Sequence, residues 1–474
     1  MEAAQGLRGD GICASGYPVA AMRFADAASL LAYLDRESIR FHKVGVFDID
    51  GVFRGKYINR DKFESAINKG FGFCDVVLGW DSNDQLFDNT TVSSWDTGYR
   101  DAHVALDLGT VRRLPFEDDT IVIIGGFEGG EYEAVCPRGL LTRTIAKAEA
   151  MGFSPRAALE YEFFLFKETP ESARAKGYRD LEPLTPGMFG YSMLRSGVHA
   201  ELYHDLIESM EAMECPIEGL HTETGPGVLE AALQHDLALE AADKAALFKT
   251  YTKVLCQRVG LMATFMAKWS NDYPGQSGHI HVSLESPEDG RNLFADADDP
   301  DGLSKTMRHF LAGQVALMPE LLVMVCSTVN AYRRLVPGMW APTHANWGIE
   351  NRTTAIRAIP GGAGTRSEYR VGPADANPYL ALSAALASGL WGIENEIELP
   401  EVIRGNAYEN PGEGTKALPG SLAEASARFR ASKAARELFG DTFVDHFAAT
   451  RDWEAREARK HVSDWDLARY FEII

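Results

Sequence analysis

Three stretches of the chain alternate between apolar and polar residues, the pattern that favours half-buried β-strands. They lie at residues 159–166, 278–284 and 366–370. Because successive side chains of a strand point to opposite faces, each stretch presents one apolar and one polar face. Two more alternating stretches, 44–49 and 53–58, flank Asp50-Gly51. This arrangement predicts a β-hairpin with a tight turn.

Other parts of the chain carry helical signals. Leucines at helical spacing occur at 30–34, Pro137 opens a helical run through Ala150, and residues 237–260 predict a long helix. The very apolar stretch 317–329 predicts a buried helix that is too short to span a bilayer. Shorter strands are expected at 104–108 and 121–124, and the acidic, turn-rich segment 287–302 is expected to be a surface loop.

Together these elements predict an α+β protein with two domains. Residues 1–24 show no periodic spacing of apolar residues and are expected to be a loose extension. Residues 25–133 predict a small domain dominated by strands, and residues 134–474 a large domain of helices and strands. A length of 474 residues suits one large domain with a smaller one.

Charge and cysteine content exclude several classes of function. The formal net charge of -21 argues against nucleic acid or an anionic membrane as a partner. The six cysteines are scattered and form no Cys-x-x-Cys pair, so neither a zinc clip nor a disulfide framework is expected. The N-terminus lacks the apolar core of a secretory signal, and no apolar stretch is long enough to span a membrane. A cytoplasmic location is therefore expected.

The polar faces of the three predicted strands carry chemically matched groups. The side chains on them are Glu160 and Glu162; His279, His281 and Ser283; and Arg366, Glu368 and Arg370. Any one strand could simply have a solvated side. If the three pair in one sheet, however, several carboxylates share one surface and raise one another's pKa unless cations intervene. Carboxylates with a single imidazole suit Mg²⁺ or Mn²⁺.

Two further segments extend this picture. Glu223 and Glu230 flank a Gly-Pro-Gly turn that can aim both carboxylates at one point. Arg334, Arg352 and Arg357 add guanidinium groups, which match phosphate and carboxylate oxygens. A site that handles a nucleoside triphosphate needs both kinds of charge.

Taken in order, these motifs resemble those of the glutamine synthetase family. The matching segments run from Glu160-Tyr-Glu162 through Gly278-His279-Ile-His281-Val-Ser283 and Arg334-Leu-Val-Pro-Gly338 to Arg366-Ser-Glu368-Tyr-Arg370. The resemblance covers residues 136 to about 400, and more weakly the N-terminal part. It implies an N-terminal β-grasp domain and a catalytic domain with a curved antiparallel sheet. It also implies a homo-oligomeric ring, commonly a dodecamer of two stacked hexamers, with active sites between neighbouring subunits.

The resemblance also implies roles for individual residues. Two or more Mg²⁺ or Mn²⁺ ions would be held by Glu162, Glu223 and Glu230 and by Glu160, His279 and Glu368. ATP would lie near His281, Ser283, Arg352 and Arg366. Glutamate would be bound by Arg334 and Gly275, and Arg357 and Arg370 would stabilise the transferred phosphoryl group. The implied reaction is an ATP-dependent ligation through γ-glutamyl phosphate.

The sequence departs from the family where ammonium is expected to bind. Trp340 stands where a glutamate is usual, in Gly338-Met-Trp-Ala-Pro342. An expected N-terminal aspartate aligns with Cys74, and Asp75 lies one residue away. Losing an anion and gaining an indole favours an organic amine over ammonium. The motif from Gly275 to His281 is also similar to that of the amine-using branch.

The predicted nucleophile is therefore an alkylamine, polyamine, ethanolamine or aniline. Its deprotonating base is not identified, although Asp75, Asp81 and Glu133 are acidic residues of the N-terminal part. Two alternatives remain: an ordinary glutamine synthetase that uses ammonia, and a non-enzymatic structural or regulatory relative. The presence of every metal and arginine position argues against the second alternative. Tyr408 lies near the position of the family's regulatory modification, but the match is poor.

Overall fold

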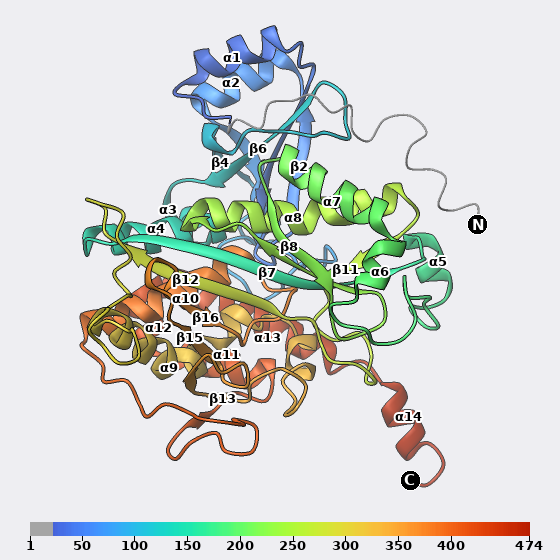
Figure 1. Ribbon diagram of the computed structural model, residues 1–474. Coiled ribbons are helices and arrows are strands. Elements are labelled where there is room, and N and C mark those ends of the chain that lie inside the picture. Colours follow the sequence, from blue (N-terminus) through green and yellow to red (C-terminus); the bar gives the residue numbers. More distant parts are fainter. Residues whose placement is uncertain (1–21) are drawn as a thin grey trace.

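The computed structural model describes residues 22–474, so most of the predicted N-terminal extension lies outside the described residues. The chain builds a smaller sheet from its N-terminal part and a larger sheet from its middle (Figure 1). Helices from the centre and the C-terminal part pack around the larger sheet. The predicted α+β class is confirmed.

The smaller sheet has six strands in the order β2-β1-β6-β4-β3, with β5 paired to β6. Strands β1 and β6 are parallel, and the other pairs are antiparallel. The strands are β1 Phe41–Phe47, β2 Phe53–Ile58, β3 Phe71–Cys74, β4 Asp101–Leu106, β5 Arg112–Arg113 and β6 Thr120–Phe127. Helices α1 Ala27–Arg36 and α2 Arg60–Lys69 accompany them.

The predicted hairpin is confirmed as β1 and β2. Its turn is closed by a hydrogen bond from the Gly51 N–H to the Asp48 carbonyl. Gly51 has φ +82°, a left-handed conformation that glycine adopts without strain. The Asp48 carboxylate also accepts the N–H groups of Asp50 and Val52. The turn is therefore held rigidly by its own residues.

The larger sheet has nine strands in the order β14-β15-β16-β12-β7-β9-β8, with β10 and β11 paired to β7. Its strands are β7 Ser154–Phe166, β8 Ile217–Thr222, β9 Val228–Leu233, β10 Asp236–Leu237, β11 Met262–Thr264, β12 Gly278–Glu285, β14 Trp347–Ile349, β15 Ile356–Ile359 and β16 Arg366–Tyr369. All of its pairs are antiparallel except β14 with β15. A separate two-stranded ladder joins β13 His344–Ala345 to β17 Lys416–Ala417.

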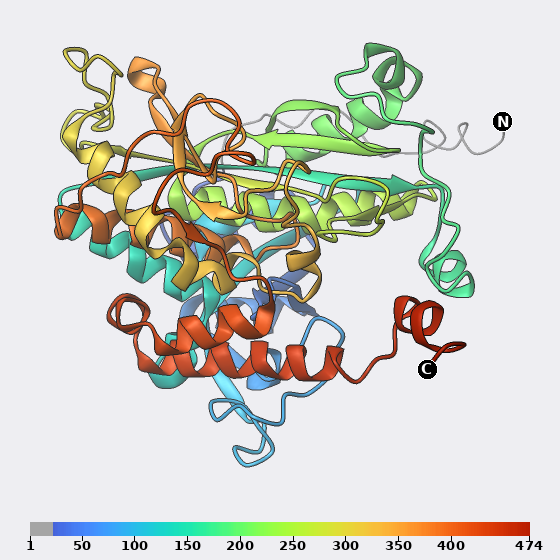
Figure 2. The ribbon, with the colours of Figure 1, turned by 90° about the horizontal axis from the view of Figure 1, so that it is seen from below.

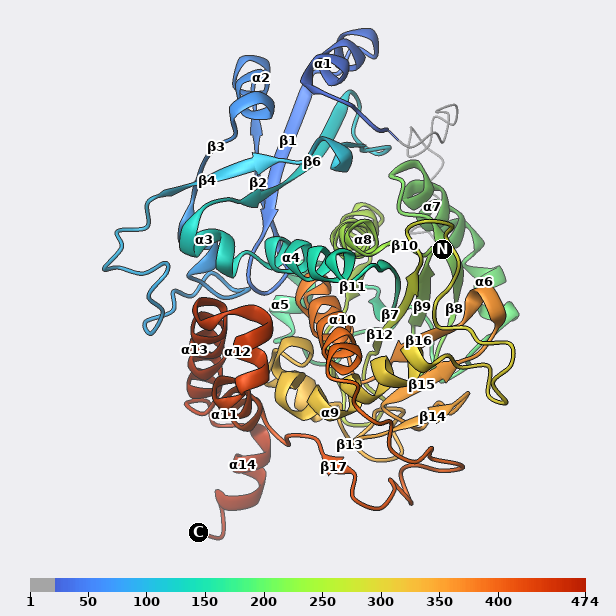
Figure 3. The ribbon, with the colours of Figure 1, turned by 90° about the vertical axis from the view of Figure 1, so that its left-hand side faces the viewer.

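One face of the larger sheet is apolar and covered by helices. Leu159, Tyr161 and Phe163 of β7, with Ile280 and Val282 of β12, are buried in the main core. Helices α4 Pro137–Ala150, α8 Ala238–Arg258 and α10 Pro378–Glu394 pack against this face (Figure 3). Because side chains alternate along a strand, the polar groups of β7 and β12 point to the opposite face.

The remaining helices connect and flank this core. They are α3 Gly130–Val135, α5 Pro170–Ala175, α6 Met193–Val198, α7 Ala200–Ala212, α9 Lys305–Val325, α11 Leu422–Ala431, α12 Lys433–Phe439, α13 Asp441–Ala458 and α14 Asp464–Tyr470. Helices α11 and α13 lie together below the sheet, and α14 projects from the body (Figure 2). Within residues 22–474, no helix combines the length and hydrophobicity that crossing a membrane requires.

The helix predicted at 317–329 differs from the observed one. Helix α9 begins earlier, at Lys305, where the Ser304 hydroxyl caps it by accepting the Met307 N–H. It ends at Val325, and Asn330–Arg333 form a short 3₁₀ helix. The predicted burial is confirmed, because residues from Leu317 to Val325 are almost all enclosed. The predicted bounds are wrong because the first turns of α9 mix polar and apolar residues, although several of them are also buried.

Candidate functional site

The three strands with matched polar faces are neighbours in the larger sheet. Strand β12 pairs with β7 on one side and with β16 on the other. The register places His279 opposite Glu160 and His281 opposite Glu368. The condition that these strands pair in one sheet is therefore met. Their polar groups consequently form one continuous surface.

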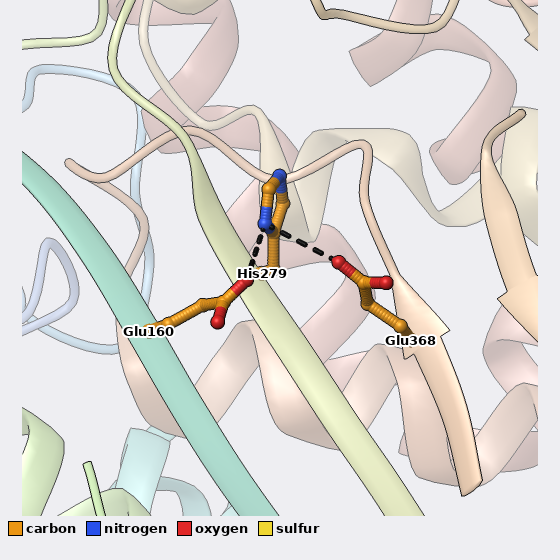
Figure 4. A group of neighbouring side chains, drawn as sticks. All are labelled: Glu160, His279 and Glu368. Atoms are coloured by element: carbon orange, nitrogen blue, oxygen red, sulfur yellow. Dashed lines mark hydrogen bonds and ion pairs between the residues drawn. The ribbon is translucent and has the colours of Figure 1, made fainter. Parts of the chain in front are cut away.

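Glu160, His279 and Glu368 meet at the centre of this surface (Figure 4). The His279 Nδ1 atom lies 2.6 Å from a Glu160 carboxylate oxygen and 3.5 Å from a Glu368 carboxylate oxygen. One ligand atom from each residue lies within 4.8 Å of the others. Two carboxylates and one imidazole fit a divalent cation such as Mg²⁺ or Mn²⁺.

The charges around this cluster keep its carboxylates ionised. Burial alone would raise the pKa of Glu160, but hydrogen bonds from His279 and His281 hold it well below the usual range. Burial also opposes ionisation of Glu368, yet His279 and Arg370 lower its pKa to about 2. Both Arg370 and Arg357 contact the Glu368 carboxylate. Glu368 is thus presented as an anion in a nearly enclosed position.

A second group of carboxylates lies beside the first. Glu162 of β7 and Glu230 of β9 stand directly opposite each other, and Glu223 follows β8. Burial raises the pKa of Glu162 to about 8, and the Glu230 charge adds to the effect. A cation between these groups would favour their ionised forms. The donor set therefore also fits a divalent metal.

Two cavities open on the polar face and share Glu160. The first, the His281 cavity, has a volume of about 290 Å³, and the second, the Trp340 cavity, about 340 Å³. Residues of the His281 cavity include Arg156, Glu218, His235, His281, Ser283 and Arg366. Residues of the Trp340 cavity include Glu162, Tyr191, Glu223, Glu230, Gly275, Ser277, His279, Trp340, Arg352 and Arg370.

The predicted residues divide between these cavities. His281, Ser283 and Arg366 line the first, and the Arg366 Nε donates to His281 Nδ1 at 3.1 Å. The Trp340 cavity is lined by all predicted metal ligands except Glu368. It is also lined by Gly275, Trp340, Arg352 and Arg370. Glu368 and Arg357 are in neither lining and form an ion pair with each other at 3.1 Å.

Arg334 lies beneath the Trp340 cavity and does not line it. Its side chain is 1 % exposed. Its guanidinium donates to the Val371 carbonyl and the Ser277 hydroxyl, each at 2.9 Å. The predicted contact between Arg334 and glutamate stays a prediction. In this structure Arg334 supports the residues that form the cavity.

The N-terminal acids predicted near the amine do not line either cavity of their own chain. Asp75 is fully buried and accepts hydrogen bonds from Ser93 and Tyr132. The Cys74 thiol donates to the Tyr99 carbonyl. Asp81 and Glu133 also lie away from both cavities. The part of the amine pocket predicted from these residues is therefore not formed within a single chain.

Several lining residues were not predicted from the sequence. Ser277 lies inside the motif from Gly275 to His281 and could have been found there, whereas Tyr191, Glu218 and His235 lie in segments without a pattern. The Tyr191 ring stacks on His221 at a centroid distance of 4.3 Å. Tyr408 lies in neither cavity lining, and its hydroxyl oxygen is enclosed without a hydrogen-bond partner among residues 22–474.

Comparison with known proteins identifies one family. The family model described as "Glutamine synthetase, catalytic domain" matches residues 134–470. Type-1 glutamine synthetase 2 of Dictyostelium discoideum is 46 % identical over 92 % of this chain and 84 % of its own length. A glutamate–isopropylamine ligase of a Pseudomonas species is 36 % identical over 93 % of this chain and 97 % of its own.

A gamma-glutamylethanolamide synthetase of Streptomyces coelicolor is 35 % identical over 90 % of this chain and 91 % of its own. The solved structure described as a GmaS/ADP complex has a TM-score of 0.82 and 25 % identity, and the match covers 95 % of this chain and 100 % of that one. The family model covers most of the chain, and the curated relatives match nearly all of it. The chain therefore belongs to the glutamine synthetase family of ATP-dependent ligases.

Proposed function

We propose that this ligase joins the γ-carboxylate of L-glutamate to an organic amine of the alkylamine, polyamine, ethanolamine or aniline type. The observation that carries the proposal is Trp340. Its indole lines the same cavity as the carboxylates, at the position where the family resemblance places a further glutamate that binds ammonium. An aromatic face suits an alkylated or aromatic amine through apolar and cation–π contact.

The relatives support this substrate class in part. Two of them are named for isopropylamine and for ethanolamide formation. A third, at 46 % identity, is named a glutamine synthetase, which favours ammonia as the second candidate nucleophile. The identity of the amine is therefore the property that an experiment must decide.

The proposed roles follow the two cavities. ATP would occupy the His281 cavity, with Ser283 and Arg366 near it, and Arg352 would face its phosphates from the Trp340 cavity. The six metal positions would hold two or more divalent ions, which would offset phosphate charge and align the reactants. Glutamate would lie in the Trp340 cavity, near Gly275 and above Arg334.

The proposed reaction has two steps. The γ-carboxylate attacks the terminal phosphorus of ATP, which gives γ-glutamyl phosphate and ADP. Arg357 and Arg370 stabilise the negative charge on the transferred phosphoryl oxygens. The neutral amine then attacks the activated carbonyl carbon and displaces phosphate, and its extra proton passes to a base. The γ-amide of glutamate is the product.

The same resemblance supports a homo-oligomeric ring, which we propose to be a dodecamer of two stacked hexamers. Cys74 and Asp75 would then approach the site of a neighbouring subunit rather than their own. We further propose that the enzyme works in the cytoplasm, where ATP and glutamate are both plentiful.

The test is phosphate release from ATP with glutamate, Mg²⁺ and a panel of amines. The panel contains ammonia, methylamine, isopropylamine, ethanolamine, putrescine, spermidine and aniline. We expect strong turnover with at least one organic amine and weak turnover with ammonia. The product is checked by mass spectrometry as the corresponding γ-glutamyl amide. Turnover mainly with ammonia would establish the second candidate and remove Trp340 from the specificity argument.

A further inference from the structure

A buried ion pair joins the N-terminal hairpin to the last long helix. Arg451 of α13 is fully enclosed, and its Nη2 atom lies 2.7 Å from an oxygen of Asp50 in the β1–β2 turn. Apart from each other, neither of these two atoms has a hydrogen-bond partner among residues 22–474. The ion pair is therefore their main compensation for burial.

The same guanidinium also holds a segment of the catalytic part. The Arg451 Nη1 atom donates to the Ser327 carbonyl at 2.8 Å. One helical turn further on, the Glu454 carboxylate accepts the Val329 N–H at 2.8 Å. Burial raises the pKa of Glu454 to about 7, although Arg451 opposes this shift. Two side chains of α13 thus fix the backbone at residues 327–329.

Residues 327–329 lead directly to the floor of the Trp340 cavity. The 3₁₀ helix Asn330–Arg333 follows, and then Arg334. Arg334 donates to the Ser277 hydroxyl at 2.9 Å, and the Ser277 N–H donates to Glu162 at 2.7 Å. Polar contacts, joined through the backbone of residues 327–334, therefore connect Asp50 and Arg451 to a carboxylate in the cavity.

A parallel contact supports the same wall. The Asn330 side chain accepts the Lys268 N–H at 2.7 Å and donates to the Lys268 carbonyl at 2.8 Å. The segment after Lys268 carries Gly275, which lines the Trp340 cavity. None of these contacts includes a residue that lines the His281 cavity.

From these contacts we infer that Arg451 is a positioning residue for the Trp340 cavity. It sets the place of Arg334, Ser277 and Glu162 by holding residues 327–329 against the N-terminal hairpin. It touches no reacting group. The kinetic part of this inference rests on the function proposed above, with glutamate in the Trp340 cavity and ATP in the His281 cavity.

The matched variants are Arg451→Met and Arg456→Met. Arg456 lies on the same helix but is partly exposed, and it pairs with Asp88 at the surface. Arg451→Met leaves the Asp50 carboxylate buried without its partner. The double variant Arg451→Met/Asp50→Asn removes that unpaired charge, while Ser327 still lacks its donor. Arg451→Lys keeps the charge but can reach only one of the two partners at a time.

We expect Arg451→Met, alone and with Asp50→Asn, to raise KM for glutamate about 10- to 100-fold and KM for ATP less than about twofold. Arg451→Lys should give an intermediate KM for glutamate, and Arg456→Met should change neither. The double variant should recover thermal stability without recovering KM for glutamate. Equal changes in both KM values would mean that Arg451 is only structural, and this would overturn the inference.

Hydrogen–deuterium exchange provides a readout that does not depend on turnover. In Arg451→Met and Arg451→Lys we expect faster exchange at residues 327–334 and 275–278, with unchanged exchange in β8. Two results would contradict the inference in any variant that folds. One is an equal increase in exchange over the whole chain, and the other is no increase in exchange at residues 327–334. If the unchanged protein used no amine and no ammonia, the proposed function would fail, but the exchange data would still decide the role of Arg451.

Discussion

At the scale of single residues, Glu368 has the most concentrated set of contacts in the site. It faces His279 and is contacted by both Arg357 and Arg370. We predict that Glu368→Ala lowers phosphate release by about 10³-fold or more, because both charge neutralisation and metal binding are lost. The measurement is phosphate release with the preferred amine, together with calorimetric binding of Mn²⁺.

The control for this change is Glu350→Gln. Glu350 also pairs with Arg357, but its side chain is 48 % exposed and it lies apart from His279. Activity within a few-fold of the unchanged protein is expected for this control. Full activity of Glu368→Ala would remove Glu368 from the proposed metal ligands.

Trp340 is the second decisive residue. Its side chain is about half exposed at the mouth of its cavity, and its backbone is left-handed, with φ +57°. We predict that Trp340→Glu shifts the ratio of kcat/KM for ammonia over the organic amine by about 10-fold, since a cation–π contact contributes ~1–2 kcal/mol. The matched control is Trp465→Glu, an exposed indole on α14. An unchanged ratio would mean that other residues determine the choice of amine.

The sequence predicted which side chains share a face, but not which of them reach the cavity. A period of two determines that Glu160 and Glu162 lie together, whatever the rest of the fold. The position of Arg334 depends instead on hydrogen bonds to Ser277 and Val371, which no local pattern reveals. Tyr191 enters the cavity from a segment without periodicity and could not have been predicted.

At the scale of elements, alternation and turn chemistry predicted the strands that build the site. Strand β7 is longer than expected, because residues 154–158 alternate in burial without a strong hydrophobic contrast. Strands β10 and β11 are too short to give a pattern. The start of α9 was hidden because its first turns mix polar and apolar residues.

The contact between α9 and α10 offers a test of packing. A side chain added at Gly313 of α9 would collide with the Ser388 carbonyl and the backbone of Gly392 on α10. We predict that Gly313→Ala lowers the free energy of unfolding by about 2–3 kcal/mol, because the helices must separate. The measurement is denaturation by urea followed by circular dichroism.

The control is Gly197→Ala in α6, where nothing lies within 4 Å of the added methyl group. Alanine is the better helix former, so this change should leave stability equal or raise it by about 0.5–1 kcal/mol. An equal change in the free energy of unfolding for the two variants would show that α9 and α10 can move apart at Gly313 without losing stability.

At the scale of the whole molecule, local sequence patterns do not predict which distant segments contact each other. The sequence predicts the hairpin, but the contact between the hairpin and α13 joins residues at opposite ends of the chain. The His446 Nε2 atom of α13 donates to the Leu78 carbonyl at 3.0 Å, and Asn89 donates to the Ala449 carbonyl. Such contacts follow only from the complete fold.

The assembly state is also a property of this scale. We predict that light scattering gives a mass that is a multiple of the 52.1 kDa chain and corresponds to a closed ring. In such a ring, hydrogen–deuterium exchange of the backbone amides of residues 74–75 should slow with increasing protein concentration, because the subunits associate. A monomer that retained full activity would contradict both the ring and the proposed intersubunit site.

The ion pair between Asp50 and Arg451 has a consequence for biosynthesis. The hairpin turn leaves the ribosome long before α13 is made, so the Asp50 carboxylate lacks the Arg451 guanidinium during most of translation. At ~5–20 residues per second, this interval is on the order of 20–80 s. A chain that terminated before residue 451 would leave the Asp50 carboxylate without its guanidinium partner and the hairpin turn uncovered by α13, where chaperones and proteases could reach it.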